Sequence, residues 1–593
     1  MIAALSTGCS AAAAKPLAAG NGDCPARYRP HFFSKTFLVM IIFPTPMIKS
    51  LRAVMACAAT LLAPLAGISA ASAQVSPTAF EERLVPGEIA RANDAEKTAP
   101  APTSPAKITE HTIPAVLIRG IQFEGADVPA RVADAARPFI ARTLTHQALS
   151  DLAAAMTAAY QRSDVALFTI AIPDQDFADG IIRVLTAEGH IERFDLSGEV
   201  DNRNHFLVTA YAERLTVERP ISRKTLQRNL ALMSDIPGLK IEPVMGYGAA
   251  PGAVTLNLKL DNQRPTVSFG YTNRTSRLIK DGQFSGEAKL YRLLRDGDFT
   301  SMQIAVAANM KDSLYVGGQH STPLGTNGVR VDVSAAALKS RPSGTEIEGD
   351  AQIYSAGVNA PIIRSPEKNL SLRASFDILN SDNAAFGALI ATERTRAARL
   401  AATASLNGKS RKLRVKAGLS RGLNVFGADV SEMIGAPQFI KASGDAVLTQ
   451  KLGPDARVTL HAAGQWTQDT LPANERFTLG GGNFGRAFSS GLVSADRGFG
   501  VSLEPAWRPL NGGDFHRSEF YAFADYTRAD IFSRSPMGTT TTLDLGSYGA
   551  GLRAAWQDKG FVEIEVARPF DQPVAGFDQD WRLSLSWRLD VRP

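Results

Sequence analysis

The chain has 593 residues, of which 45% are hydrophobic and 21% are charged, with 49 glycines, 3 cysteines and a formal net charge of +6. This hydrophobic content excludes a disordered protein, the glycine content argues against a mainly helical one, and no apolar run reaches the ~18–20 residues of a membrane-spanning helix. A soluble multidomain protein and a membrane β-barrel remain.

Residues 47–73 have the pattern of a secretory signal peptide. Lys49 and Arg52 precede a short apolar stretch, and the small residues at 71–73 form a cleavage site. Residues 1–46 are then predicted to result from a mis-called upstream start, with a genuine N-terminal extension as the alternative.

The same N-terminal segment holds most of the net charge and all of the cysteines. Residues 1–73 contain six Lys or Arg and one Asp, so the exported chain carries a net charge of about +1, which gives no support to nucleic-acid binding. Loss of Cys9, Cys24 and Cys57 excludes disulfides and thiolate chemistry from the exported chain. Cys57 weakly resembles a lipoprotein acylation site, although the apolar stretch before it is short.

Residues 74–112 are predicted to be a semi-rigid linker, because they are poor in hydrophobic residues and contain Pro100, Pro102 and Pro105. Within this segment, residues 78–97 could form one short helix or a disordered tail.

The next two segments share one order of predicted elements, β-α-α-β-β. In residues 113–188 the predicted elements are 116–123, 127–143, 145–162, 167–172 and 180–186, and Thr145 is placed as the N-cap of the second helix. In residues 189–261 they are 191–196, 202–214, 222–233, 239–244 and 254–260. Two tandem copies of one small α/β unit are therefore expected.

Residues 262–593 lose the helical period and alternate between apolar and polar residues. About sixteen strands of about 9–12 residues are predicted, a length that suits a tilted membrane crossing. In the last strand, one face consists of Trp581, Leu583, Leu585, Trp587 and Leu589. A soluble sandwich also alternates, but strand length and tryptophans at strand ends favour a barrel. The expected fold class is α+β plus all-β, with the two tandem units followed by a 16-stranded antiparallel transmembrane β-barrel.

This layout resembles the POTRA-barrel transporters of the bacterial outer membrane, and within them the two-partner-secretion transporters (TpsB, the ShlB/FhaC/HecB family). The two tandem units then correspond to POTRA domains one and two. The second unit resembles the family's second POTRA domain at its turns, which hold Asp235, Pro237, Gly238, Pro251 and Gly252.

The most specific resemblance is a glycine-rich motif at 477–488. The family has a Gly-Gly pair followed by a Val-Arg-Gly-Tyr/Phe tip on the sixth extracellular loop, which folds back into the barrel. Residues that match this motif, or follow it, are Gly480, Gly481, Arg486, Ala487, Phe488, Asp496 and Gly498. The motif lies in a loop of about 30 residues between predicted strands eleven and twelve. Gly485 and Ala487 depart from the family's Val and Gly.

The family's partner for the loop arginine is an aspartate in a Phe-x-Asp strand motif, which matches Phe523 and Asp525. We therefore expect an Arg–carboxylate fork between Arg486 and Asp525, because this pairing is geometrically specific. The alternative is that Arg486 is a solvated loop residue.

Enzyme motifs are not supported. Gly480, Gly482 and Gly485 formally spell G-x-G-x-x-G, but no strand-to-helix context surrounds them. The eight histidines show no ligand spacing, and Glu563 and Glu565 alternate with apolar residues as lumen-facing acids would. No catalytic residue, metal, cofactor, nucleotide or nucleic acid is expected.

The resemblance implies an outer-membrane transporter of a Gram-negative bacterium that secretes a large β-helical exoprotein, unfolded in the periplasm and received by periplasmic POTRA domains. Residues 78–97 would be the plug helix of relatives, and barrel-assembly machinery and periplasmic chaperones would serve biogenesis. The alternatives are an assembly factor for outer-membrane proteins or autotransporters, a passive porin, or a surface hydrolase with a barrel anchor.

Overall fold

The computed structural model describes residues 107–108, 116–199, 205–279, 281–510, 512–535, 537–557, 559–570 and 580–592. The predicted upstream segment 1–46, the signal peptide 47–73 and the possible helix at 78–97 lie outside the described residues. Among the helices in these ranges, none combines the length and apolar character needed to span a membrane.

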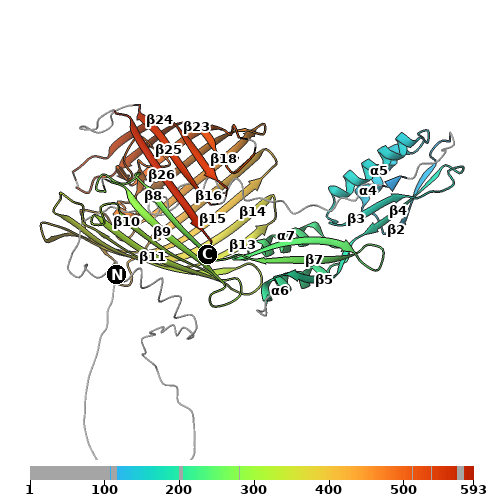
Figure 1. Cartoon of the computed structure of the whole chain (residues 1–593), viewed down its shortest axis with the longest axis horizontal. Helices are drawn as coiled ribbons and strands as arrows, with labels where there is room; N and C mark the ends of the chain where they lie inside the picture. The colour runs from blue at the N-terminus through green and yellow to red at the C-terminus, as the bar shows by residue number, and fades with distance from the viewer. Residues whose placement is uncertain are drawn as a thin grey trace, which may run out of the picture. The chain divides into compact units, whose positions relative to one another are not determined.

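The first β-α-α-β-β unit consists of β2 (Gly120–Gly125), α4 (Ala130–Ala136), α5 (His146–Gln161), β3 (Phe168–Ile172) and β4 (Ile181–Glu188), as Figure 1 shows. The sheet order is β1-β3-β4-β2, with the short β1 (Lys107–Ile108) parallel to β3. Thr145 caps α5 as predicted and accepts the Ala148 N–H at 3.0 Å. The predicted helix over 127–143 is shorter, because Pro138 lacks an N–H and Ala141 has a φ of 67°.

The second unit consists of β5 (His190–Gly198), α6 (Phe206–Val217), α7 (Arg223–Ser234), β6 (Leu239–Tyr247) and β7 (Ala253–Asn262), with sheet order β5-β7-β6. Ser222 caps α7 by accepting the Thr225 N–H at 3.2 Å. Both helices pack on one face of the sheet, where Val208, Leu215, Leu256 and Leu258 are fully buried. The repeated β-α-α-β-β order is confirmed.

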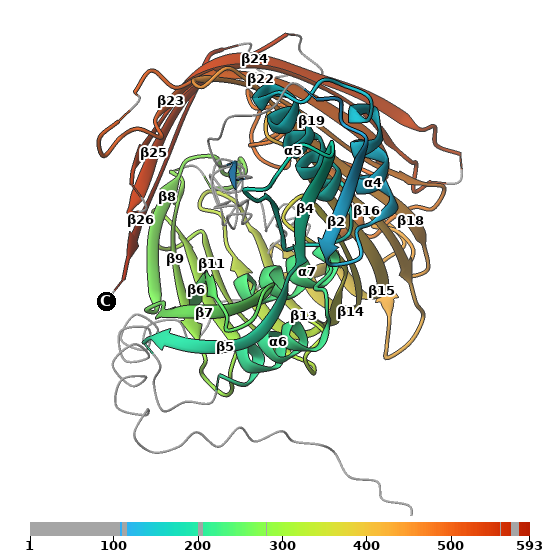
Figure 2. The ribbon, with the colours of Figure 1, turned by 90° about the vertical axis from the view of Figure 1, so that its right-hand side faces the viewer.

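Within the described residues, sixteen strands pair antiparallel with their neighbours, and β26 pairs with β8 to close the barrel. Figure 2 shows β26 and β8 next to each other. The strands are β8 (Thr266–Thr272), β9 (Gln283–Tyr291), β10 (Phe299–Ala307), β11 (Ser313–Pro323), β12 (Arg330–Ser340), β13 (Ile347–Arg364), β14 (Lys368–Ala385), β15 (Ala388–Asn407), β16 (Arg411–Gly422), β18 (Ile440–Leu452), β19 (Ala456–Thr467), β22 (Arg497–Trp507), β23 (Glu519–Ile531), β24 (Thr541–Trp556), β25 (Gly560–Pro569) and β26 (Arg582–Val591). A two-residue strand, β17 (Asp429–Val430), pairs with β15. The predicted 16-stranded barrel is confirmed, although β13, β14 and β15 have 18, 18 and 20 residues and exceed the predicted length.

The barrel strands have an apolar outer face and a polar inner face. On β26, Leu583 is 60% exposed and Leu589 is 40% exposed, whereas Ser584 and Ser586 are each 1% exposed. Leu585 and Trp587 are half-buried on the outer face, and Trp581 lies one residue before β26. A lipid-facing wall and a polar lumen follow from this alternation.

Candidate functional site

The loop between β19 and β22, residues 468–496, is folded against the inner face of the barrel wall. It contains a short 3-10 helix, η2 (Ala473–Glu475), and a hairpin of β20 (Phe477–Leu479) with β21 (Val493–Ala495). Ala487 and Phe488 are buried, and they share one apolar cluster with Tyr521 and Phe523 of β23. The loop therefore lies where the sequence places it, between the eleventh and twelfth barrel strands.

Three glycines set the backbone of the loop tip. Gly480, Gly481 and Gly485 have φ values of 88°, 117° and 68°, in the region that side chains disfavour. A Cβ on Gly480 would lie 2.3 Å from the carbonyl oxygen of Ser489. The departure of Gly485 from the family's valine thus provides a left-handed turn that a β-branched residue would strain.

Asp525 holds the backbone of this turn. Its carboxylate faces inward, is 3% exposed, and accepts the N–H of Gly485 at 2.7 Å and that of Arg486 at 3.4 Å. The Ser547 hydroxyl donates a third hydrogen bond at 2.7 Å. The predicted fork between the Arg486 guanidinium and Asp525 is wrong in its atoms, because the turn at Gly485 directs the loop N–H groups at the carboxylate.

The Arg486 side chain instead reaches two glutamates on other strands. Its Nη1 lies 2.9 Å from Glu504 Oε2 on β22 and 3.2 Å from Glu565 Oε2 on β25, and the side chain is 10% exposed. The guanidinium carbon is 4.3 Å from the centre of the Phe523 ring, a cation–π distance. Arg486 is therefore not a solvated loop residue, and Phe523 contacts it directly.

These contacts belong to a larger network of buried charges. Arg553 Nη1 lies 2.7 Å from Glu504, Arg274 Nη2 lies 3.0 Å from Glu565, and Arg457 Nη2 lies 2.6 Å from Glu519. The network comprises the arginines Arg274, Arg457, Arg486, Arg508 and Arg553 and the glutamates Glu504, Glu519, Glu563 and Glu565. This pairing matters because leaving one partner of a buried ion pair without the other costs about 3–5 kcal/mol. Sequence analysis missed Glu504, whose only signal was its position on the polar face of a predicted strand.

Asp496 lies at the base of the loop and not at its tip. It is fully buried and accepts the backbone N–H groups of Leu471 and Phe532, each at 2.8 Å. Both Nη atoms of Arg534, in the loop between β23 and β24, lie within 2.7–2.8 Å of its oxygens. An arginine–carboxylate fork therefore exists at this pair, which sequence analysis did not predict. Gly498 follows on β22, where a Cβ would lie 2.7 Å from the carbonyl oxygen of Arg528.

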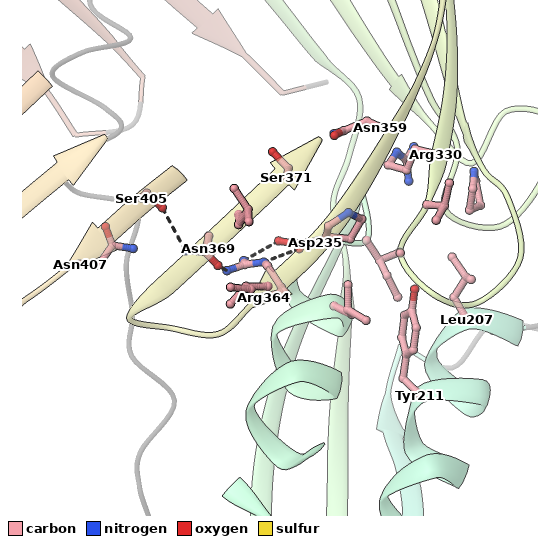
Figure 3. A pocket seen from close by; sticks show the side chains of 18 of the residues that line it. Leu207, Tyr211, Asp235, Arg330, Asn359, Arg364, Asn369, Ser371, Ser405 and Asn407 are labelled. Atoms are coloured by element: carbon pink, nitrogen blue, oxygen red, sulfur yellow. Dashed lines mark hydrogen bonds and ion pairs between the residues drawn. The ribbon is translucent and has the colours of Figure 1, made fainter. Parts of the chain in front are cut away.

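A second site lies where α6 and α7 meet the strand ends of β12–β15, as Figure 3 shows. Asp235 accepts hydrogen bonds from Nε and Nη2 of Arg364, both at 2.7 Å. A cavity of about 510 Å³ adjoins this pair. Leu207 and Tyr211 line it from α6, and Ser371 and Ser405 line it from inward positions of β14 and β15. Burial raises the pKa of the Tyr211 hydroxyl.

Two tandem β-α-α-β-β units, a closed barrel of sixteen strands and a loop folded into the lumen define an outer-membrane transporter of the POTRA-barrel class. A family model for the ShlB-type POTRA domain matches residues 116–189. A second model, "Haemolysin secretion/activation protein ShlB/FhaC/HecB", matches residues 253–554. The chain belongs to this family, and it is a two-partner-secretion transporter of the outer membrane with a secreted exoprotein as partner and its POTRA region in the periplasm. The expected family, transporter function and location are confirmed.

Individual relatives agree with this assignment. The heme/hemopexin transporter protein HuxB of Haemophilus influenzae is 20% identical over 465 residues, which cover 74% of this chain and 80% of the relative. The solved structure of CdiB from Escherichia coli superposes with a TM-score of 0.65 at 16% identity, covering 93% of this chain and all of that one. CdiB from Acinetobacter baumannii gives a TM-score of 0.56 at 15% identity, with the same coverage. These structures share the fold with this chain.

Proposed function

We propose that this transporter receives one large exoprotein, unfolded and destined to become a β-helix, at its two POTRA domains and releases it through the barrel when loop 468–496 moves. The observation that carries the proposal is the way the loop is held. Its tip is attached to the wall by hydrogen bonds and ion pairs around Arg486 and Asp525, which water can replace.

The energetics suit a gate. Breaking a fully buried ion pair on one side costs about 3–5 kcal/mol, whereas a solvated pair contributes about 0–1 kcal/mol. Once water follows the loop tip out of its site, Glu504 stays paired with Arg553 and Glu565 stays paired with Arg274. Each of the two glutamates that Arg486 contacts therefore keeps an arginine partner when Arg486 leaves.

The POTRA domains, assigned to residues 113–188 and 189–261, offer strand edges to an extended chain. In the second domain β5 and β6 are the outer strands of the sheet. An extended segment that adds to such an edge gains backbone hydrogen bonds, and side-chain pockets provide selection. Folding of the exoprotein outside the cell would then make export directional. Insertion of the transporter itself would depend on barrel-assembly machinery and periplasmic chaperones.

Two POTRA domains favour secretion over the assembly of other barrels, for which a longer POTRA array is expected. A passive porin has no use for POTRA domains. The expected activity is thus transport, with no enzymatic step.

The proposal is tested by Arg486→Ala, with secretion of the transporter's own exoprotein as the readout. Secretion is expected to fall sharply while barrel level and heat-modifiable gel mobility stay normal. The matched control is Arg421→Ala. The Arg421 side chain is exposed and lies on the outer face of β16, away from the loop. Unchanged secretion with Arg486→Ala would refute the role of the loop.

A further inference from the structure

The start of the folded-in loop, residues 470–476, contacts a different part of the barrel wall from the loop tip. In this base segment Asn474, Glu475 and Arg476 are 6%, 1% and 9% exposed. The base segment forms ion pairs with β15 and β18, whereas the tip contacts β22, β23 and β25. The two parts of the loop are therefore held by separate sets of strands.

Glu475 is bound by two cations of the wall. Its carboxylate lies 2.6 Å and 3.0 Å from Nη2 and Nη1 of Arg399 on β15, and 2.9 Å from Nζ of Lys441 on β18. Lys441 also donates to the Glu475 carbonyl oxygen at 2.7 Å, and the Gln465 side-chain amide donates to the same oxygen at 3.0 Å. Charge-assisted contacts at two points are stronger than neutral hydrogen bonds. Both the side chain and the backbone of Glu475 are thus held by the wall.

Release of the base segment would leave a buried cation without an acid. Arg399 keeps Asp377 as a partner. Lys441, however, is 9% exposed and has no other carboxylate at ion-pair distance in the part of the chain that the structure describes. Removing one partner of a buried ion pair is strongly unfavourable. Release of the tip has no such effect, since Glu504 and Glu565 each keep an arginine, so the base segment is the harder part to release.

The loop before β18 also binds the base segment. The Ala436 N–H donates to the Thr470 carbonyl oxygen at 2.9 Å, and the Arg476 guanidinium donates to the Ile434 carbonyl oxygen. The base segment is therefore held by the barrel wall and by a neighbouring loop together.

We propose that Glu475 is a positioning residue of the transporter, which keeps the base segment in place during export so that the tip alone leaves the wall. The proposal rests on the proposed function, in which loop 468–496 moves. A fixed base keeps the tip close to its contacts and so raises the effective concentration at which they form again. Loss of the Glu475 charge should free both parts of the loop, whereas loss of the Arg486 charge should free the tip only.

The first test is the labelling rate of a cysteine in the resting protein, placed either at buried Ala473 in the base segment or at buried Ala487 in the tip. Glu475→Gln should raise labelling at position 473 at least about tenfold, because the lost hydrogen bonds are to charged groups. Labelling at position 487 should rise by a smaller factor. Arg486→Gln should raise labelling at position 487 only.

Two further variants separate this role from a general loss of stability. Adding Lys441→Gln to Glu475→Gln should slow labelling of the base segment again, because no unpaired cation is then buried. The matched control, Asp332→Asn, removes an inward acid that pairs with an arginine away from the loop, and it should change neither rate. Unchanged labelling at position 473 in Glu475→Gln, no rescue by Lys441→Gln, or equal increases at both positions in Arg486→Gln would overturn the proposal.

The second test crosslinks each part of the loop during secretion. Cysteines at Thr470 and Ala436 join the base segment to the loop before β18, and cysteines at Ser490 and Thr275 join the tip to the loop after β8. One backbone hydrogen bond, of 2.9 Å and 3.2 Å respectively, already links each pair, which suits the Cα separation of about 4.4–6.8 Å that a disulfide spans. A short bifunctional thiosulfonate joins a pair that does not oxidise directly.

The base crosslink should leave secretion of the exoprotein unchanged, and the tip crosslink should stop it until a reductant is added. Arrest by the base crosslink would overturn the proposal while leaving a moving loop intact. Normal secretion with the tip crosslinked would instead refute the proposed function, so the two failures are distinguishable.

Discussion

The partner of the Arg486 guanidinium is the most direct test of the loop geometry. The structure assigns the side chain to Glu504 at 2.9 Å and Glu565 at 3.2 Å, and it assigns Asp525 to the loop backbone. A double-mutant cycle separates these assignments. Arg486→Gln is combined once with Glu504→Gln and once with Asp525→Asn, since both changes remove a charge and conserve volume.

The expected coupling follows from the contacts. A hydrogen bond to a charged group contributes about 1.5–3 kcal/mol. Arg486 shares Glu504 with Arg553, so we expect a coupling energy with Glu504 of about 1–2 kcal/mol, toward the lower end of that range. The Arg486 side chain makes no hydrogen bond to Asp525 in the part of the chain that the structure describes, so that coupling should stay below about 0.5 kcal/mol.

The assay is the labelling rate of a cysteine placed at Ala487, which is buried in the loop tip. If labelling requires a brief opening of the loop, a change of about 1.4 kcal/mol in the opening free energy changes the rate tenfold. A cysteine on an exposed surface loop of the same chain controls for reagent access. Equal coupling of Arg486 to Asp525 and to Glu504 would refute the assignment.

Three further predictions follow from other contacts. Arg534→Gln removes the two-point ion pair with buried Asp496 and should lower the free energy of unfolding of the purified protein by about 3–5 kcal/mol. An unchanged melting curve would contradict this prediction. Gly485→Val forces a β-branched residue to a φ of 68°, which should cost about 1–3 kcal/mol and raise tip labelling at least severalfold, whereas unaltered labelling would show that the turn is not strained. Arg364→Ala breaks a partly exposed ion pair with Asp235, so the free energy of unfolding should change by less than about 1 kcal/mol. Amide hydrogen exchange in α7 should become faster. Slower or equal exchange would argue that this pair does not hold α7 against the barrel strands.

The sequence predicts well those features that depend on the spacing of apolar and polar residues within one helix or strand. The β-α-α-β-β order, the Thr145 cap and the alternating faces of the barrel strands follow from residues close together in the chain. The prediction of one continuous helix over 127–143 was wrong. It gave the apolar spacing more weight than Pro138, which ends the regular helical hydrogen bonds.

The contacts of the loop could be predicted only in part. The motif placed Arg486, Phe523 and Asp525 together, and the structure brings them together. It could not show which atoms meet, because the turn at Gly485 decides whether Asp525 faces a side chain or backbone N–H groups. Asp496 and Arg534 belong to different loops that meet only after the barrel closes, so no local pattern indicates their fork.

The attachment of the loop at two separate places limits how it can move. Its base is tethered through Asp496 to the loop after β23, while its tip is held by the wall around Arg486 and Asp525. The tip can come away while the base keeps its anchor, so the hinge falls inside the segment and not at its ends. In the proposed transport cycle, such a tethered arm would return to the same contacts with the wall, and the barrel rim would not need to be rebuilt to close the passage.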